Sequence, residues 1–251
     1  MSTKEKLLAA TITIFFVCLV VWVVRTTPDA PPPMEKIEPP TVMEYEGNTI
    51  IEEKDGQIIW ELTCEKLTID SITQNAELYK PTWKFYQREE DKERIWELKA
   101  TKGIYYQAEK FMHVEGEVDV TNSDDAKLLC DNLDWLFEQE IMTATGNVSV
   151  TNKDGAKLLS DKLEWITQEK KIIATDNVDV TNSDGARLLS DKLEWLTAEE
   201  KVIAEGNVRI SKDDVRAFGD LAYADNDFKH FGLMGNAKVL KGVKDDGTFE
   251  Q

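Results

Sequence analysis

The sequence has little of several things that common protein functions require. Its 251 residues include two histidines and three cysteines, and 30 Lys and Arg stand against 48 Asp and Glu, a formal net charge of −18. Nucleic-acid binding needs a basic face for phosphates, so partners of that class are not expected. His113 and His230 lie far from each other and from any cysteine, which argues against a zinc site. Neither a glycine-rich phosphate loop nor a nucleophile elbow is found, so no catalytic residue and no cofactor is predicted.

Proline is also scarce, and six of the seven lie between positions 28 and 40. Such a segment is stiff and extended, and we assign residues 26–44 to a linker. Before it, LLAATITIFFVCLVVWVV at 7–24 carries no charge and has about the minimum length of a membrane-spanning helix. Lys4 and Lys6 precede this run and Arg25 follows it, which favours a cytoplasmic N-terminus and an exported remainder. We therefore predict a stub and anchor over 1–25; a cleaved signal peptide is the alternative, but no small-x-small site follows the run.

From 45 to 242 the sequence shows no sustained helical period, and much of it repeats every thirty residues. Units begin at Gly116, Gly146, Asp176 and Gly206, and the two middle units share 21 of 30 positions. Weaker copies start near Trp60 and Trp96. The last unit is degenerate, as terminal units of a stack usually are. In that unit we align Tyr223 with Trp195 after a slip of about two residues, and residues 243–251 are left as a tail.

Each unit predicts two or three antiparallel strands with one apolar face. In NVSV, Val148 and Val150 share a face, and Asp154-Gly155 supplies the positive φ of a hairpin turn. In AKLLSDKLEWIT, Leu163 and Trp165 share a face, whereas Leu158 has the opposite parity. Either Leu159 is the inward residue or a bulge lies near Ser160-Asp161, and the sequence leaves this open. Stacked units make a long twisted sheet that folds over its apolar face, either around a closed core or as an open trough.

Two functional interpretations of the repeated acidic residues are weak. Asp161 and Glu164 resemble a glycosidase pair, but the pair recurs as Asp191 and Glu194, and a catalytic site is singular. The turns TNSDD, TNKDG and TNSDG resemble calcium loops, but each offers too few ligands, and turn chemistry explains Asn, Asp and Gly without a metal. We predict no enzyme and no metal site.

The repeat places Cys64, Ala100, Cys130, Ser160 and Ser190 at one equivalent position that requires a small residue. An intervening unit then separates the two cysteines by about 10 Å or more, since neighbouring strands are about 4.8 Å apart. A disulfide requires less than about 7 Å between Cα atoms. Both thiols are therefore expected to be free.

An N-terminal anchor, a proline-rich linker and this repeat together resemble the lipopolysaccharide-transport family of LptC, LptA and the OstA-like domain. The family pattern is a G-N-V-x-V strand, then G/S-D-K-I/L-x-Y/W, then K-x-x-A-x-G-N-V, and tyrosine is commoner than tryptophan at the aromatic position. It is carried here at Gly146-Asn147-Val148, Ser160-Asp161-Lys162-Leu163, Trp165 and Ala174, and again from Asn177 to Val208. The anchor is similar to LptC, while the later units are more similar to LptA.

The resemblance implies an all-β, elongated open jellyroll over 45–242 that follows one transmembrane helix. It implies a periplasmic carrier, anchored in the inner membrane, that accepts lipopolysaccharide from an ABC transporter and passes it to an LptA-like bridge protein by edge-strand addition. The alternation gives a cargo-facing stripe of Val118, Val120, Leu133, Trp135, Val148, Val150, Leu163, Trp165, Val178, Val180, Leu193, Trp195, Val208, Ile210 and Tyr223. The expected edge strand for the partner is Asn236, Ala237, Lys238, Val239 and Leu240. The alternative is an anchored envelope scaffold with a closed core, because a soluble core and a lipid trough share one alternation pattern.

Overall fold

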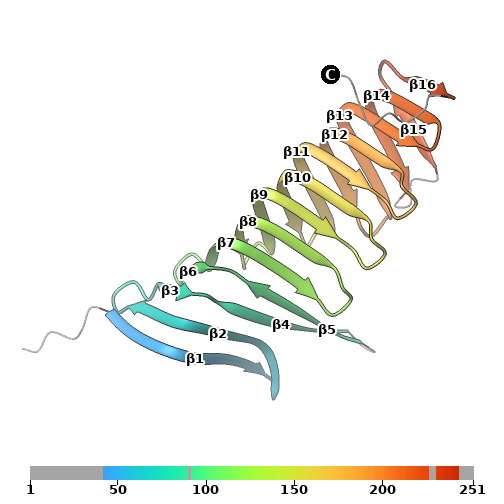
Figure 1. Ribbon diagram of the computed structural model, residues 1–251. Coiled ribbons are helices and arrows are strands. Elements are labelled where there is room, and N and C mark those ends of the chain that lie inside the picture. Colours follow the sequence, from blue (N-terminus) through green and yellow to red (C-terminus); the bar gives the residue numbers. More distant parts are fainter. Residues whose placement is uncertain (1–41, 90–91, 226–229, 243–251) are drawn as a thin grey trace, which may run out of the picture. The chain divides into compact units, whose positions relative to one another are not determined.

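Sixteen strands form one sheet, with antiparallel pairing throughout, in the residues that the structure describes (Figure 1). The computed structural model describes residues 42–89, 92–225 and 230–242. The strands are β1 (Val42–Lys54), β2 (Gln57–Asp70), β3 (Ala76–Tyr79), β4 (Thr82–Glu89), β5 (Lys92–Lys99), β6 (Lys102–Tyr106), β7 (Phe111–Asn122), β8 (Lys127–Leu136), β9 (Ile141–Thr151), β10 (Lys157–Ile166), β11 (Lys171–Thr181), β12 (Arg187–Leu196), β13 (Lys201–Lys212), β14 (Val215–Asp225), β15 (Phe231–Met234) and β16 (Lys238–Lys241). The predicted all-β class is confirmed for these ranges.

The predicted anchor at 7–24, the linker up to residue 41 and the tail at 243–251 lie outside the described residues. Strand β1 begins at Val42, slightly before the predicted start of the β domain at 45. Within 42–89, 92–225 and 230–242, no helix has the length and apolar character of a membrane span.

Each thirty-residue repeat contributes two long strands, and each long strand bends near its middle. Between β9 and β10, Ser160 pairs with Val148 and Lys162 pairs with Thr145, so Asp161 alone stands opposite Gly146 and Asn147. This is a β-bulge, which kinks a strand and increases its twist. Gly146 and Asn147 have φ of 77° and 49°, a left-handed conformation that glycine and asparagine tolerate best. The bulge alternative is therefore confirmed near Ser160, and Leu158, not Leu159, is the buried residue.

The bulges divide the sheet into two arms. Arm A contains residues 141–145 of β9 and 162–166 of β10, and arm B contains 148–151 and 157–160. The same division recurs from β7 to β14. At both ends the arms use separate strands: β6 and β5 pair with the two halves of β7, and β15 and β16 pair with the two halves of β14. Figure 1 shows the strands β7 to β14 following one another, with fainter portions behind the nearer ones.

A side-chain hydrogen bond recurs at every bulge from β9 onward. Asn147 Nδ2 donates to Asp131 Oδ2 at 2.8 Å, and Asn177 donates in the same way to Asp161 at 2.6 Å. Asn207 with Asp191, and Asn236 with Asp220, continue the series at 2.8 and 2.9 Å. A Cβ added at Gly146 or Gly206 would collide with the facing aspartate, which explains the glycine. Asp176 occupies this place in its unit at φ 64°, the strained member of the series.

The hairpin turns use asparagine as the sequence predicts. Asn152 Oδ1 accepts hydrogen bonds from the backbone N–H of Asp154 and Ala156, at 3.0 and 2.9 Å. Asn122 and Asn182 do the same in their own turns. The side-chain oxygen of the TN motif therefore closes the turn.

Candidate functional site

Fourteen of the fifteen residues predicted for the apolar stripe lie in one interior cluster between the arms. The buried members are Val118, Val120, Leu133, Val148, Leu163, Val178, Leu193, Val208 and Ile210. The half-buried members packed against them are Trp135, Val150, Trp165, Val180 and Trp195. Arm B supplies the valines and the isoleucine, and arm A supplies the leucines and tryptophans.

Tyr223 does not belong to this interior, so its prediction is wrong. Its side chain is 53% exposed, and it pairs with Ile203 on the outer face, while Ala222 and Ala224 are buried on either side of it. The hydrogen bond from Asn236 to Asp220 makes Asp220 equivalent to Asp191. Counted from Asp220, Tyr223 is equivalent to Glu194, which faces outward. Ala224 is equivalent to Trp195, which faces inward. The assumed slip of two residues was the error.

Several interior residues that alternation did not predict lie beside the stripe. Ala144, Ala174 and Ala204 are almost fully buried and pair with Leu163 and Leu193 in arm A. Their spacing of thirty residues was a usable signal, because a small residue repeated on an inward position indicates close packing. Met112 and Val114, both fully buried in β7, precede Met142 and Ala144 by thirty residues, so the same period also indicated them.

A small apolar cavity lies between the arms. Its volume is about 200 Å³, and arm A lines it with Trp135, Met142 and Trp165. Arm B contributes the remaining lining residues, Phe85, Gln87, Trp96, Leu98 and Val120. Ligand pockets commonly have roughly 300–1,000 Å³, so this cavity is smaller than a typical ligand site.

Aromatic contacts join the two arms around this cavity. Phe85 of β4 lies 4.7 Å from Trp135 of β8 between ring centroids, and Trp96 of β5 lies 5.6 Å from Trp165 of β10. These strands are not neighbours in the sheet, so the contacts cross the interior. Aromatic pairs at such distances attract beyond their buried area. The arms therefore meet through side chains at this point.

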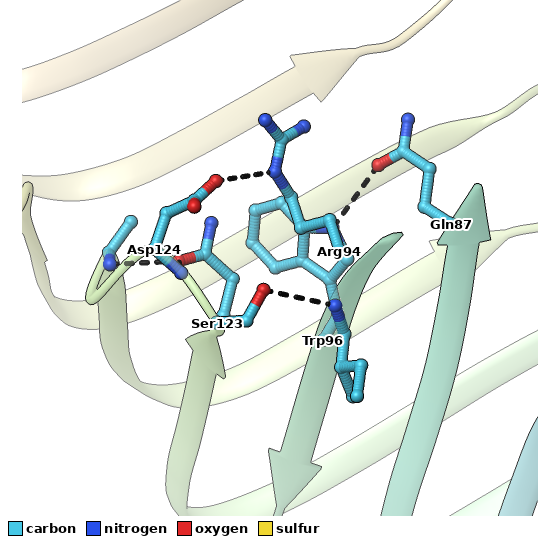
Figure 2. A network of polar contacts seen from close by, with 8 residues as sticks. Gln87, Arg94, Trp96, Ser123 and Asp124 are labelled. Atoms are coloured by element: carbon cyan, nitrogen blue, oxygen red, sulfur yellow. Dashed lines mark hydrogen bonds and ion pairs between the residues drawn. The ribbon is translucent and has the colours of Figure 1, made fainter. Parts of the chain in front are cut away.

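A polar network holds Trp96 in arm B (Figure 2). Its indole Nε1 donates to Gln87 Oε1 at 3.4 Å, and Arg94 Nε donates to Asp124 Oδ2 at 2.8 Å. The backbone N–H of Ile95 donates to Ser123 Oγ at 3.3 Å. The network ties the β4–β5 end of arm B to the β7–β8 turn, and Gln87 gives Trp96 a hydrogen-bond partner within its own arm.

Some polar atoms in the interior have no hydrogen-bond partner within the described part of the chain. They include Ser160 Oγ, Ser190 Oγ and the indole nitrogens of Trp83 and Trp195. A buried polar group without a partner is unfavourable and rare in folded proteins. These atoms occupy an otherwise apolar interior, which makes them candidate contacts for oxygen atoms of a bound molecule.

The repeated carboxylates serve contacts within the fold. Asp161 is exposed at its bulge and accepts from Asn177, and Glu164 pairs with Lys162 at 2.7 Å. Asp191 and Glu194 repeat both contacts, with Asn207 and Lys192. The recurrence gives these residues a structural role.

Cys64 and Cys130 are both free and buried, which confirms the prediction from the stacking order. Cys130 pairs with Val118 across the strands, as Ser160 pairs with Val148, so the predicted equivalence holds for these two positions. Burial raises the pKa of the Cys130 thiol to about 12, and the charge of Asp131 adds to the effect. Burial raises the pKa of Cys64 as well.

The expected partner edge lies at the end of arm B. Lys238, Val239 and Leu240 belong to β16, and Asn236 and Ala237 precede it. Among the described strands, β16 pairs only with β14. Val239 is 61% exposed. At the other end of the sheet, β1 pairs only with β2 within the same ranges.

Comparisons with known proteins place the sequence with one family. The family described as lipopolysaccharide-assembly, LptC-related, matches residues 10–188, which is well over half of the chain. A similar solved structure is LptH from Pseudomonas aeruginosa, the LptA-homologous periplasmic component of its lipopolysaccharide transport device. It is 8% identical, with a TM-score of 0.44, and the similarity covers 47% of this chain and 94% of LptH. No curated protein matches the sequence.

Proposed function

Because the chain belongs to the LptC-related family of lipopolysaccharide-assembly proteins, we propose that it carries lipopolysaccharide in the interior between its two arms. The supporting observation is the apolar cluster that contains the stripe, which extends from Leu62 of β2 to Ala224 of β14. Acyl chains favour such an interior, because each buried CH₂ contributes about 0.8 kcal/mol. The outer faces carry the charged residues, which leaves the sugars of the lipid in water.

We also propose a route for the lipid. The chain is anchored in the inner membrane through residues 7–24 with its β domain in the periplasm. It accepts lipid from an ABC transporter, and it passes the lipid to an LptA-like protein along a jellyroll bridge. Transfer between similar apolar interiors is nearly neutral in free energy, so a transporter could drive it without a deep energy well. The family match ends at residue 188, and β13 and β14 continue the same bulged repeat beyond it; these strands would lengthen the bridge.

A closed structural scaffold is the competing function, and the small cavity favours it. The unpartnered polar atoms of Ser160, Ser190 and Trp195 support a carrier instead. Oxygen atoms of acyl esters and hydroxyacyl groups would accept the hydrogen bonds that these groups now lack.

The first test compares two adjacent residues on opposite faces of β9. Val150 faces the interior near the end of arm B, and Ser149 faces outward. We expect Val150→Asp to reduce bound glycolipid at least about tenfold, because an unpaired carboxylate in an apolar site is strongly unfavourable. Ser149→Asp should keep the lipid. The measurement is native mass spectrometry of the full chain, purified in mild detergent from membranes of a lipopolysaccharide-producing host.

Circular dichroism of both variants controls for unfolding. If the mass spectrum of the wild-type chain shows no bound lipid under conditions in which a known carrier retains its lipid, the carrier proposal is wrong and the scaffold function takes its place.

Strand β16 can be tested separately as the partner edge. Addition of a strand from another chain satisfies the free backbone groups of an edge. A photo-crosslinking amino acid at Val239 should capture an LptA-like jellyroll protein in cells that carry the pathway. Ile72, which is 80% exposed in the turn after β2, is the control position. Equal capture from both positions, or none from Val239, would contradict β16 as the partner edge.

A further inference from the structure

The small space between the arms raises the question of how a lipid enters it. A cavity of about 200 Å³ is too small for a glycolipid with several acyl chains. Most inward residues of both arms are already buried against one another. If the interior accepts lipid, as proposed above, the arms must first separate.

The fold provides a line about which the arms could rotate. Every strand from β7 to β14 passes from one arm to the other at or opposite a bulge, and the bulges follow one another in register. At each of the bulges from β9 onward, the Asn–Asp hydrogen bond described above braces the bend. Rotation about this row needs no ladder hydrogen bond within an arm to break.

Aliphatic side chains of both arms pack together in the interior, and aromatic pairs join the arms at the cavity. Phe85–Trp135 and Trp96–Trp165 form what we call the clasp. Ion pairs such as Arg94–Asp124 in arm B and Lys192–Glu205 in arm A stay within one arm. Apolar contacts across the arms can be exchanged for contacts with an alkyl chain without leaving a polar group unpaired.

The clasp surrounds the cavity directly. Three of its four residues are tryptophans, and all four line the cavity. Trp96 donates a hydrogen bond to Gln87. Trp165 contacts Trp96 and lines the cavity. An alkyl chain that entered between Trp96 and Trp165 would enlarge an existing space and not create a new one.

We propose that the clasp holds the two arms together and opens, by rotation of the arms about the bulge row, to seat an alkyl chain in the cavity between Trp96, Trp135 and Trp165. This inference rests on the proposed function, because it describes how that interior is filled. It assigns Trp96 and Trp165 to control of entry, in addition to their place in the lining of the cavity.

The repeat supplies a matched control. Trp195 occupies the position of Trp165 in the next unit, and both are half-buried. Trp165→Leu therefore removes a clasp residue, and Trp195→Leu removes an equivalent tryptophan that has no part in the clasp. Both variants lose one indole fluorophore, so their signals remain comparable.

The experiment uses the full chain in mild detergent and follows tryptophan quenching by a brominated sixteen-carbon fatty acid in a stopped-flow instrument. We expect Trp165→Leu to take up the probe about two- to tenfold faster than wild type, the factor that corresponds to one aromatic contact. Trp195→Leu should stay within about twofold of wild type. Gln87 is exposed, and Gln87→Leu removes the hydrogen bond that Trp96 donates to it. This variant should also accelerate uptake, and it replaces Trp165→Leu if that variant does not fold.

The outcomes separate the two proposals. Uptake by all chains at the same rate would overturn the clasp and leave the carrier function standing. Acceleration in Trp195→Leu equal to that in Trp165→Leu would also overturn it, because the effect would then follow from loosening the interior anywhere. If no chain takes up the probe, both the carrier function and the clasp fail.

Discussion

Replacing Leu133 with alanine should lower the free energy of unfolding by about 2–5 kcal/mol, the range for a large-to-small change in a packed interior. Leu133 is 1% exposed in β8 and pairs with Val114 and Ala144 on the inward side of arm A. The loss combines the transfer of buried methyl groups to water with the void that remains. Urea unfolding of the full chain in mild detergent, followed by circular dichroism, measures the change.

Leu129 provides the control within the same strand. It lies on the other side of the bulge, on the outer face, and is 40% exposed. Leu129→Ala should change the free energy of unfolding by no more than about 0.5 kcal/mol, as expected for a surface position. Equal effects for the two leucines would mean that the bulge does not set the inward face as described.

The repeat made much of this fold predictable. A thirty-residue period with alternating valines fixed the strands and the inward face of arm B, and the TN turns, two of them with glycine at 155 and 185, indicated hairpins. Leu158 and Leu163 could not both face inward in a regular strand, so their opposed parity was in itself a signal of a bulge. The extra residue of the bulge lies on β9, at Gly146-Asn147. The opposed parity of Leu158 and Leu163 within β10 did not show on which strand it lies.

The contacts across the interior were not predictable in the same way. Alternation says that Phe85 and Trp135 face inward, but not that they meet, because fifty residues separate them and the offset between the arms depends on the twist of the whole sheet. Tyr223 failed for a related reason. The last turn is shorter than its counterparts, and an alignment by aromatic residues alone placed Tyr223 one position away from its true equivalent.

Cys130 should be about a thousandfold less reactive toward an alkylating reagent in the folded chain than in the unfolded one. The thiolate is the reactive form, and burial raises the pKa of Cys130 from 9.0 to about 12. At pH 8 the thiolate fraction therefore falls by about three orders of magnitude. Peptide mass spectrometry after timed alkylation, with and without urea, distinguishes Cys130 from Cys64 and Cys18.

The protection of Cys130 should also depend on pH. Because the pKa is raised in the folded state, the ratio of unfolded to folded rates should be constant below pH 9 and shrink as the pH rises toward 12. The same shift contributes stability that is fully present below pH 9 and is lost as the pH rises through 12. Cys130→Ser should remove that loss and still fold, since Ser160 and Ser190 occupy the equivalent positions in later units. A folded-state rate close to the unfolded one would mean that the arms open far more often than the closed interior implies, and that a lipid would meet little resistance on entering.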